Sequence, residues 1–211
     1  MKLKQKDPEK VFVDFQKETK LSDEHIEAFE KYADLLMTSN EDFNLTAIRD
    51  LSGIMRQHFQ DSISLAQATD LMKIKSIADI GTGAGFPALP LKILYPHLTV
   101  YLIEVTKKKQ NFLLEVVKLL GLTDVHIVDA DWRTFLRTTK YDIDMFITRA
   151  ALDEVELIRM FQPSCFYKDR ELVYWVTDLW EPHKKAIPFL TRCFEYKLAK
   201  KSRQLAFFKA P

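Results

Sequence analysis

The sequence predicts an α/β fold: a doubly wound, mostly parallel sheet with a helical N-terminal extension. From residue 76 to residue 150, short apolar runs alternate with stretches of helical periodicity, the pattern of parallel strands joined by crossover helices. Residues 8–71 carry helical periodicity alone. We therefore expect a helical N-terminal lobe over residues 1–70 and an α/β domain over residues 71–211, packed as one compact unit.

The helical lobe is expected to begin with two helices within residues 8–38. Ser22, between Leu21 and Asp23, offers a side-chain cap for the second helix. The polar segment 38–44 is predicted to break the pattern, which resumes over residues 51–71.

The α/β domain is expected to alternate strands and helices and to end in an antiparallel edge pair. The expected order is strand 76–80, helix 87–95, strand 99–104, helix 107–120, strand 125–130, strand 144–150, helix 155–161, strand 171–177, helix 181–190, and the edge segments 193–200 and 203–210.

The charge balance argues against a strongly cationic protein, because 31 basic residues face 30 acidic ones. Local basic patches are still possible, and two stand out. The first is Lys107, Lys108 and Lys109, and the second is Lys197, Lys200, Lys201 and Arg203. Either patch alone is as well explained by a solvated face, so neither establishes nucleic-acid binding.

Membrane and metal sites are not expected. No apolar run approaches the roughly 20 residues of a membrane span, and the N-terminus lacks the apolar core of a signal peptide. We therefore expect a cytoplasmic protein. Cys165 and Cys193 lie too far apart for a paired metal motif and are expected to be reduced packing residues.

The segment DIGTGAG at 79–85 holds three of the chain's 5 glycines. Gly81, Gly83 and Gly85 predict a strand that turns sharply into a helix, with a nucleotide-like cofactor close to the bare main chain. A tight turn that needs glycine only for packing remains an alternative.

An acidic residue at the end of the next strand would bind the ribose of such a cofactor. Glu104 stands there, and its carboxylate can accept from both ribose hydroxyls. This arrangement suits NAD as well as S-adenosylmethionine. The absence of GxGxxG spacing and of the Walker lysine, together with Asp79 at the strand end, favours S-adenosylmethionine. At the end of the third strand, Asp131 and Trp132 could meet the adenine, although Trp132 is equally well explained as core.

Several longer segments resemble one known family. They are FNLTAIRD at 43–50, RQHFQDSISL at 56–65, IADIGTGAGFPALPLKI at 77–93, YLIEVTKKKQNFLLEVVKLLGL at 101–122 and ITRA at 147–150. Over about residues 20–150, the chain resembles the RsmG (GidB) family of small-subunit ribosomal RNA guanine-N7 methyltransferases. The resemblance implies a Rossmann-like methyltransferase sheet, S-adenosyl-L-methionine as cofactor, and methyl transfer to N7 of a guanine in small-subunit (16S-type) ribosomal RNA or a ribosomal subunit.

The resemblance also implies site residues. The cofactor set, joined to the residues of the glycine turn, is Asp79, Gly81, Gly83, Gly85, Phe86, Glu104, Asp131, Trp132, Arg133 and Arg149. The chain departs from the family pattern at three places. Glu104 replaces the usual Asp, Trp132-Arg133 replaces a small or apolar residue followed by Glu, and Thr177-Asp178 stands where a lysine-glycine is usual.

Guanine N7 attacks through a lone pair and has no proton to lose, so we predict positioning and electrostatics and assign no catalytic residue. Asn44 and Arg149 are candidates to orient the substrate, while Asn44 is equally well explained as a helix cap. His58 and Asp61 are further candidates on the RNA side, with His58 favoured as structural. The RNA-binding candidates are Lys107, Lys108, Lys109, Lys200, Lys201 and Arg203.

Three alternatives remain open at this point. The chain could methylate a small molecule or a protein, or it could be a non-catalytic RNA-binding or ribosome-assembly module on the same fold. A nicotinamide oxidoreductase is the third. We expect a monomer.

Overall fold

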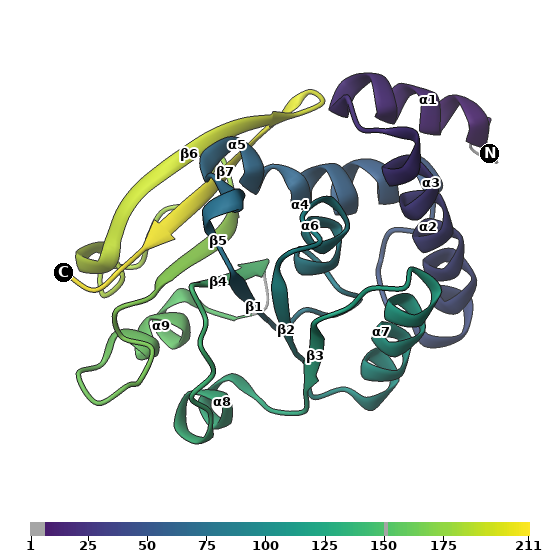
Figure 1. Cartoon of the computed structure of the whole chain (residues 1–211). Helices are drawn as coiled ribbons and strands as arrows, with labels where there is room; N and C mark the ends of the chain where they lie inside the picture. Colours follow the sequence, from purple (N-terminus) through teal and green to yellow (C-terminus); the bar gives the residue numbers. More distant parts are fainter. Residues whose placement is uncertain (1–6, 150–151) are drawn as a thin grey trace.

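The protein, described by a computed structural model over residues 7–149 and 152–211, is built around one seven-stranded sheet (Figure 1). Residues 1–6 of the predicted lobe and Ala150 of the predicted strand 144–150 lie outside the described residues. The strands are β1 Ser76–Ile80, β2 Thr99–Ile103, β3 Val125–Val128, β4 Met145–Arg149, β5 Glu171–Thr177, β6 Leu190–Leu198 and β7 Lys201–Phe208.

The sheet order is β3-β2-β1-β4-β5-β7-β6. Strands β1 to β5 pair in parallel, and β7 runs antiparallel to both β5 and β6. This confirms the doubly wound fold with an antiparallel edge. The chain moves outward from β1 in both directions, so the carboxyl ends of β1 and β4 flank the point where such sheets bind ligands.

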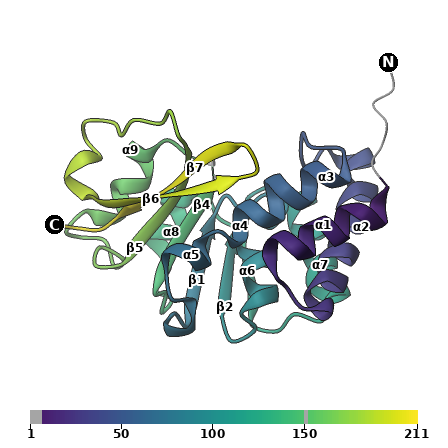
Figure 2. The same cartoon turned by 90° about the horizontal axis from the view of Figure 1, so that it is seen from above.

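Helices cover both faces of the sheet, with α1, α2, α6 and α7 on one side and α8 and α9 on the other (Figure 2). The α-helices are α1 Pro8–Thr19, α2 Asp23–Phe43, α3 Leu51–Gly53, α4 Asp61–Ile63, α5 Leu65–Ala68, α6 Ala88–Leu94, α7 Lys107–Leu119, α8 Trp132–Thr138 and α9 Glu154–Leu157. A π-helix, η1, spans Ile54–Gln60, and short 3-10 turns are η2 Leu71–Lys73, η3 Ile158–Phe161 and η4 Ile187–Phe189.

Two hydrophobic clusters occupy the two faces of the sheet. Successive strand residues alternate between them: Ile77 belongs to one cluster and Ala78 to the other, and Met145 and Phe146 divide in the same way. The cluster that contains Ile77 also contains Phe29 from α2 and other residues of the helical segment. Residues 7–70 and the sheet therefore share one hydrophobic core.

The predicted helix break at residues 38–44 is wrong. Helix α2 continues to Phe43 and ends at Asn44, whose φ of 49° is left-handed. The polar residues do not unwind the helix because Asn40 is buried and has partners. Its side-chain amide donates to the Thr46 carbonyl at 3.0 Å, and its side-chain oxygen accepts from the Thr46 N–H at 2.9 Å.

The predicted helix at 181–190 is also wrong, since only the turn η4 forms there. Pro182 and Pro188 restrict the residues before them to extended backbone. The buried Glu154 side chain also accepts from the Trp180 indole and the His183 N–H, which holds this segment in an irregular path. The helix predicted at 155–161 is present only as α9 followed by the 3-10 turn η3, and α8 was not predicted.

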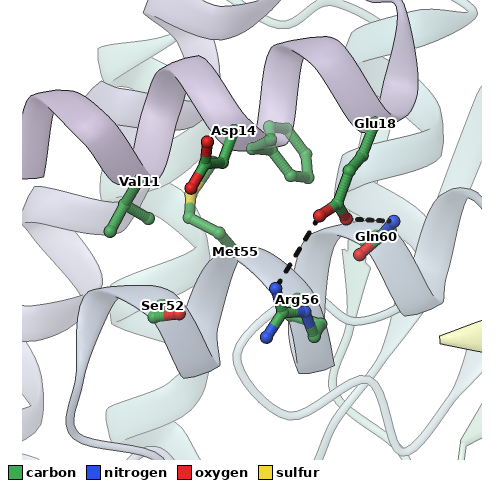
Figure 3. Close-up of a pocket in the computed structure, with 8 residues that line it drawn as sticks. Val11, Asp14, Glu18, Ser52, Met55, Arg56 and Gln60 are labelled. Atoms are coloured by element: carbon green, nitrogen blue, oxygen red, sulfur yellow. Dashed lines mark hydrogen bonds and ion pairs between the residues drawn. The ribbon is translucent and has the colours of Figure 1, made fainter. Parts of the chain in front are cut away.

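A small crevice lies between α1 and η1 (Figure 3). Its volume is about 20 Å³, and Glu18 bridges it by accepting from Gln60 at 3.1 Å and pairing with Arg56 at 3.9 Å. The crevice is too small for a ligand larger than a water molecule. Among the described helices, none is long and apolar enough to cross a membrane.

Candidate functional site

The glycine turn directly follows β1, and all three of its glycines have positive φ: 65° at Gly81, 61° at Gly83 and 95° at Gly85. A Cβ atom on Gly85 would collide with the Tyr32 hydroxyl and lie 2.5 Å from Leu89 Cδ1. On Gly83, the nearest atom would be the Gly81 oxygen at 4.0 Å. Packing therefore requires glycine at Gly85, whereas Gly83 is explained by its backbone conformation and leaves space beside the turn.

Tyr32 fastens α2 to this turn. Its hydroxyl donates to the Ala84 carbonyl, and its ring stacks on Phe86 with centroids 5.5 Å apart. Periodicity marked Tyr32 only as an apolar helix position, and no local signal in the sequence indicated that it supports the turn.

Asp79 ties the turn to the start of α6. Its Oδ2 accepts from the Thr82 hydroxyl at 2.7 Å and from the Ala88 N–H at 3.0 Å. Its Oδ1 is buried and has no hydrogen-bond partner among the described residues. Burial raises the pKa of Asp79 to about 7, even though these hydrogen bonds and Arg149 act in the opposite direction.

Glu104 lies at the carboxyl end of β2, facing the turn. Its side chain accepts from the Gly83 N–H at 3.1 Å and from the Thr106 N–H at 2.9 Å, and Lys109 pairs with it at 3.7 Å. A carboxylate has about four acceptor positions, so capacity remains for two hydroxyl donors. Glu104 is therefore held in place and can still bind a diol.

A cavity of about 480 Å³ opens between these elements. Its lining residues are Ile80, Gly81, Ile103, Glu104, Val105, Thr106, Lys109, Ala130, Asp131, Trp132, Arg149 and Leu152. The size and the mixture of apolar walls with few polar groups are typical of a site for a nucleotide-sized ligand. The cavity lies at the carboxyl ends of β1, β2 and β4, where doubly wound sheets bind ligands.

The predicted cofactor residues divide into three groups around this cavity. Gly81, Glu104, Asp131, Trp132 and Arg149 line it. The others that belong to the turn, namely Asp79, Gly83, Gly85 and Phe86, shape the backbone or pack behind it.

Arg133 alone points away from the cavity. Its guanidinium pairs with Glu156 at 2.8 Å, in a second groove. The preceding residues start α8: the Asp131 side chain caps the helix by accepting from the Thr134 N–H at 2.9 Å, and the buried Trp132 indole donates to the Glu156 carbonyl at 3.1 Å. The capping hydrogen bonds lower the pKa of Asp131.

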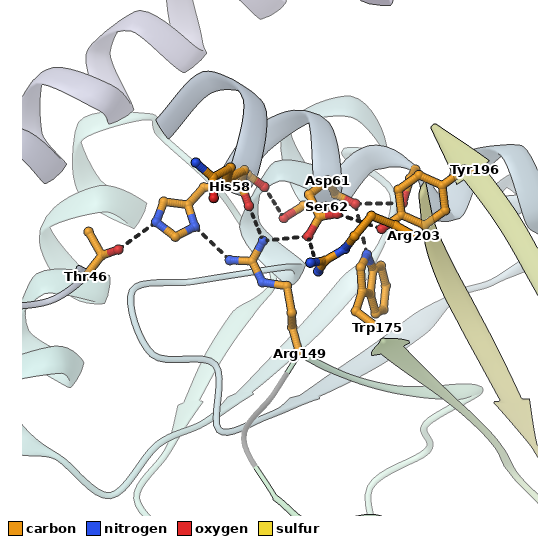
Figure 4. A network of polar contacts seen from close by, with 10 residues as sticks. Thr46, His58, Asp61, Ser62, Arg149, Trp175, Tyr196 and Arg203 are labelled. Carbon is orange, nitrogen blue, oxygen red and sulfur yellow. Dashed lines mark hydrogen bonds and ion pairs between the residues drawn. The ribbon is translucent and has the colours of Figure 1, made fainter. Parts of the chain in front are cut away.

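Arg149 joins the end of β4 to the helical segment (Figure 4). Its Nη1 donates to the Gln57 carbonyl at 2.8 Å and to Asp61 Oδ2 at 3.2 Å, and its Nη2 lies 2.9 Å from His58 Nδ1. The guanidinium also lies 5.3 Å from the centroid of the Phe86 ring. The arginine thus borders the cavity while most of its hydrogen bonds go to η1 and Asp61.

His58 is a buried, neutral histidine in this network (Figure 4). Burial and the neighbouring Arg149 lower its pKa to about 3. Because arginine can only donate, Nδ1 is the acceptor, and Nε2 carries the proton toward Thr46 Oγ1 at 2.8 Å. The imidazole stacks on Phe86 with centroids 4.4 Å apart, which agrees with the structural interpretation of this residue.

Asp61 is the centre of the network (Figure 4). Besides Arg149, its carboxylate accepts from the Tyr196 hydroxyl at 2.6 Å and pairs with Arg203 at 3.3 Å, and the Trp175 indole donates to its backbone carbonyl at 2.9 Å. The sequence analysis placed Asp61 near the substrate but had no signal for Tyr196 or Trp175. It also grouped Arg203 with surface lysines, whereas the structure turns it inward.

The remaining predicted residues lie outside the cavity, with the exception of Lys109. Asn44 is exposed and accepts from Arg49 at 2.8 Å at the end of α2. Lys107 pairs with Asp129 at 3.5 Å, and the Lys108 Nζ lies 5.7 Å from the Phe43 ring centroid, so the start of α7 borders the end of α2. Lys200 and Lys201 are exposed at the β6–β7 turn.

Curated relatives carry one name. A protein of Listeria monocytogenes serovar 1/2a named ribosomal RNA small subunit methyltransferase G is 42% identical over 132 residues, which are 61% of this chain and 56% of the relative. A protein of the same name from Chloroflexus aggregans is 42% identical over 142 residues, 65% of this chain and 58% of the relative. These matches span less than two thirds of the relatives' own length.

Solved structures share the fold at low identity. MtNAS in complex with MTA and tNA superimposes with a TM-score of 0.59 at 14% identity, over 84% of this chain and 71% of that one. A precorrin-6y methyltransferase from Geobacter metallireducens gives 0.54 at 15% identity, over 72% of this chain and 87% of that one.

A family model described as rRNA small subunit methyltransferase G matches residues 25–181. This range contains the glycine turn, Glu104, Trp132, Arg149 and Asp61. The chain therefore belongs to the GidB family of small-subunit ribosomal RNA methyltransferases.

Proposed function

We propose that the protein transfers a methyl group from S-adenosylmethionine to N7 of a guanine in small-subunit ribosomal RNA. The observation that carries the proposal is the cavity beside the glycine turn, in which Glu104 keeps free acceptor capacity next to apolar walls. The name shared by the relatives supports the substrate class. MtNAS, which has a similar fold, has been solved in complex with S-adenosylmethionine.

The cavity fits such a cofactor. Glu104 would accept from the ribose hydroxyls, and the apolar side chains of Ile80, Ile103 and Trp132 would surround the adenine. Arg149 would offer its positive charge to the carboxylate of the methionine moiety. When bound, the cofactor supplies a methyl group on a sulfonium, which is electrophilic without a metal.

The protein's own residues have to position the reactants rather than move a proton. Guanine N7 presents a lone pair, so a general base is not required. His58, the imidazole nearest to Arg149, is neutral and already bonded at both ring nitrogens. Orientation and electrostatic fit are therefore the contributions that we expect from Glu104, Arg149 and the wall residues.

The RNA side is proposed to use the exposed lysines near the cavity. Lys107, Lys108 and Lys109 begin α7 directly after the Glu104 loop, and Lys200 and Lys201 extend from the β6–β7 turn. Asn44 is proposed to orient the substrate from the neighbouring end of α2. We further propose that the protein acts in the cytoplasm as a monomer in which residues 1–70 form a lobe of one unit with residues 71–211.

The test is transfer of radiolabelled methyl from S-adenosylmethionine to ribosomal RNA from cells that lack the gene. Intact small subunits and stripped RNA are offered separately, and the labelled base is mapped. Label at one guanine N7 is the expected result, and the better acceptor identifies the assembly state that is recognised.

Other outcomes separate the alternatives. Label on a protein or small molecule would replace the RNA with another acceptor. RNA binding without transfer, in protein that binds the cofactor, would indicate a non-catalytic module. Loss of cofactor binding as well would overturn the assignment of the cavity.

A further inference from the structure

A second groove, of about 460 Å³, lies on the other side of α8 from the cofactor cavity. Helix α8 and the segment 159–166 form its walls. Its lining residues are Arg133, Leu136, Arg137, Thr139, Lys140, Arg159, Gln162, Ser164, Cys165 and Phe166. Four of these ten residues are cations, in a chain whose net charge is only +1.

The charge in the groove is only partly compensated. Arg133 and Arg159 each pair with the same carboxylate, Glu156, at 2.8 Å. These hydrogen bonds lower the pKa of Glu156 to about 2, so it stays ionised. Asp131, at the start of α8, is the other acidic residue beside these cations, and its hydrogen bonds go to Thr134.

The two remaining cations, Arg137 and Lys140, are exposed. Within the described part of the chain, neither forms an ion pair with a carboxylate. The groove therefore presents an excess of positive charge to a polyanion.

An aromatic ring stands at the same groove. Phe166 is 50% exposed, although its neighbour Tyr167 is fully buried. The two rings meet edge to face at 5.1 Å, and the Tyr167 hydroxyl is fixed by Thr139 at 2.8 Å and the Tyr141 N–H at 3.0 Å. Phe166 is thus an exposed ring on a rigid support, which suits stacking by an unpaired base.

The groove and the cofactor cavity share a wall. Trp132 lines the cavity, and its indole donates to the backbone carbonyl of Glu156, whose carboxylate holds Arg133 and Arg159 on the groove side. A single strand of RNA that delivers a base to the cavity would continue past this wall within a few nucleotides.

We infer that this groove binds single-stranded RNA next to the target nucleotide, with phosphates at Arg137 and Lys140 and a base stacked on Phe166. The inference rests on the proposed function, because it names a further contact of the same RNA substrate. RNA is favoured over an acidic peptide because the groove combines cations with an exposed, supported aromatic ring.

The experiment measures binding of the full chain to stripped small-subunit ribosomal RNA over a series of salt concentrations. The double variant R137A/K140A is expected to bind at least about tenfold more weakly at low salt. Loss of two phosphate contacts should also lower the slope of log affinity against log salt by about 1.4 for a single strand. The charge-retaining R137K/K140R should keep the slope.

Phe166→Ala tests the stacking contact separately. It should weaken binding by about tenfold at unchanged salt slope, because stacking releases no counterions. K10A/K17A, which removes two exposed lysines of α1 on the far side of the molecule in Figure 1, is the matched control and should bind as the parent does. S-adenosylmethionine affinity and thermal unfolding should match the parent in every variant, because none of these residues lines the cavity.

An unchanged slope in R137A/K140A would overturn the groove assignment and leave the proposed function intact if the parent still binds and methylates RNA. Equal affinity of the groove for polyglutamate and RNA would overturn the choice of RNA. If the parent itself neither binds nor methylates the RNA, both the groove and the proposed function fail.

Discussion

Arg149 and Asp61 form an ion pair across 88 positions of sequence, with Nη1 3.2 Å from Oδ2. Their side chains are 13% and 2% exposed. The same carboxylate oxygen pairs with Arg203. One buried negative charge therefore neutralises two arginines, one at the cavity edge and one on β7, and links the helical segment to both halves of the sheet.

Asp61→Asn should destabilise the protein by about 3–5 kcal/mol, because it leaves Arg149 and Arg203 without their carboxylate. Urea unfolding measures the effect. Asp34→Asn, at an exposed position of α2, is the matched control and should change the unfolding free energy by less than about 0.5 kcal/mol. Equal stability of the two variants would show that Asp61 does not organise the network.

Gly85→Ala and Gly121→Ala separate steric collision from backbone strain. Both glycines have positive φ, but a Cβ at Gly85 meets Tyr32 and Leu89, whereas one at Gly121 meets nothing within 4 Å. Gly121→Ala should cost about 1 kcal/mol, and Gly85→Ala should cost at least twice as much. Thermal unfolding of both variants checks the order, and similar losses would contradict the packing role of Gly85.

Asp79 gives a stability change with a defined pH window. Its pKa is raised from 3.8 to about 7 by burial, so between these values the folded state binds more protons than the unfolded state. Its favourable contribution is complete below about pH 3.8 and is lost as the pH rises through 7.

Asp79→Asn removes this titration. Relative to the parent, the variant should gain unfolding free energy as the pH rises from about 4 to about 8, which denaturant unfolding at several pH values measures. A difference between the two proteins that does not vary with pH would mean that Asp79 titrates near its ordinary value.

Gly81→Asp should abolish S-adenosylmethionine binding, because it places a side chain and a negative charge in the wall of the cavity. Gly121→Asp is the control, since Gly121 has a similar positive φ of 61° and follows α7 outside the cavity. Calorimetric titration compares the two variants. Parent-like affinity in Gly81→Asp would remove the glycine turn from the cofactor site.

Local patterns predicted the sheet well because each strand carries its own signal. The apolar run 76–80, the glycine turn after it and Glu104 at the end of the next strand were sufficient to locate the cavity. Patterns failed where a single partner decides the structure. Asn40 keeps a polar stretch helical through Thr46, and Glu154 together with two prolines prevents a helix at 181–190.

The direction of long side chains could not be predicted either. Arg133 and Arg203 belong to segments with sensible functional interpretations, yet Glu156 and Asp61 draw them elsewhere. The contacts of Asp61 with Tyr196 and Arg203 span 135 and 142 positions, so no local spacing contains them.

The position of β7 between β5 and β6 has a consequence for synthesis. β6 leaves the ribosome before β7, yet β7 separates it from β5. A nascent chain can assemble β1 to β5 in order, but β6 has no edge to join until β7 has emerged. Asp61 also waits for Arg203 until then, so the polar network closes among the last events in the making of the molecule.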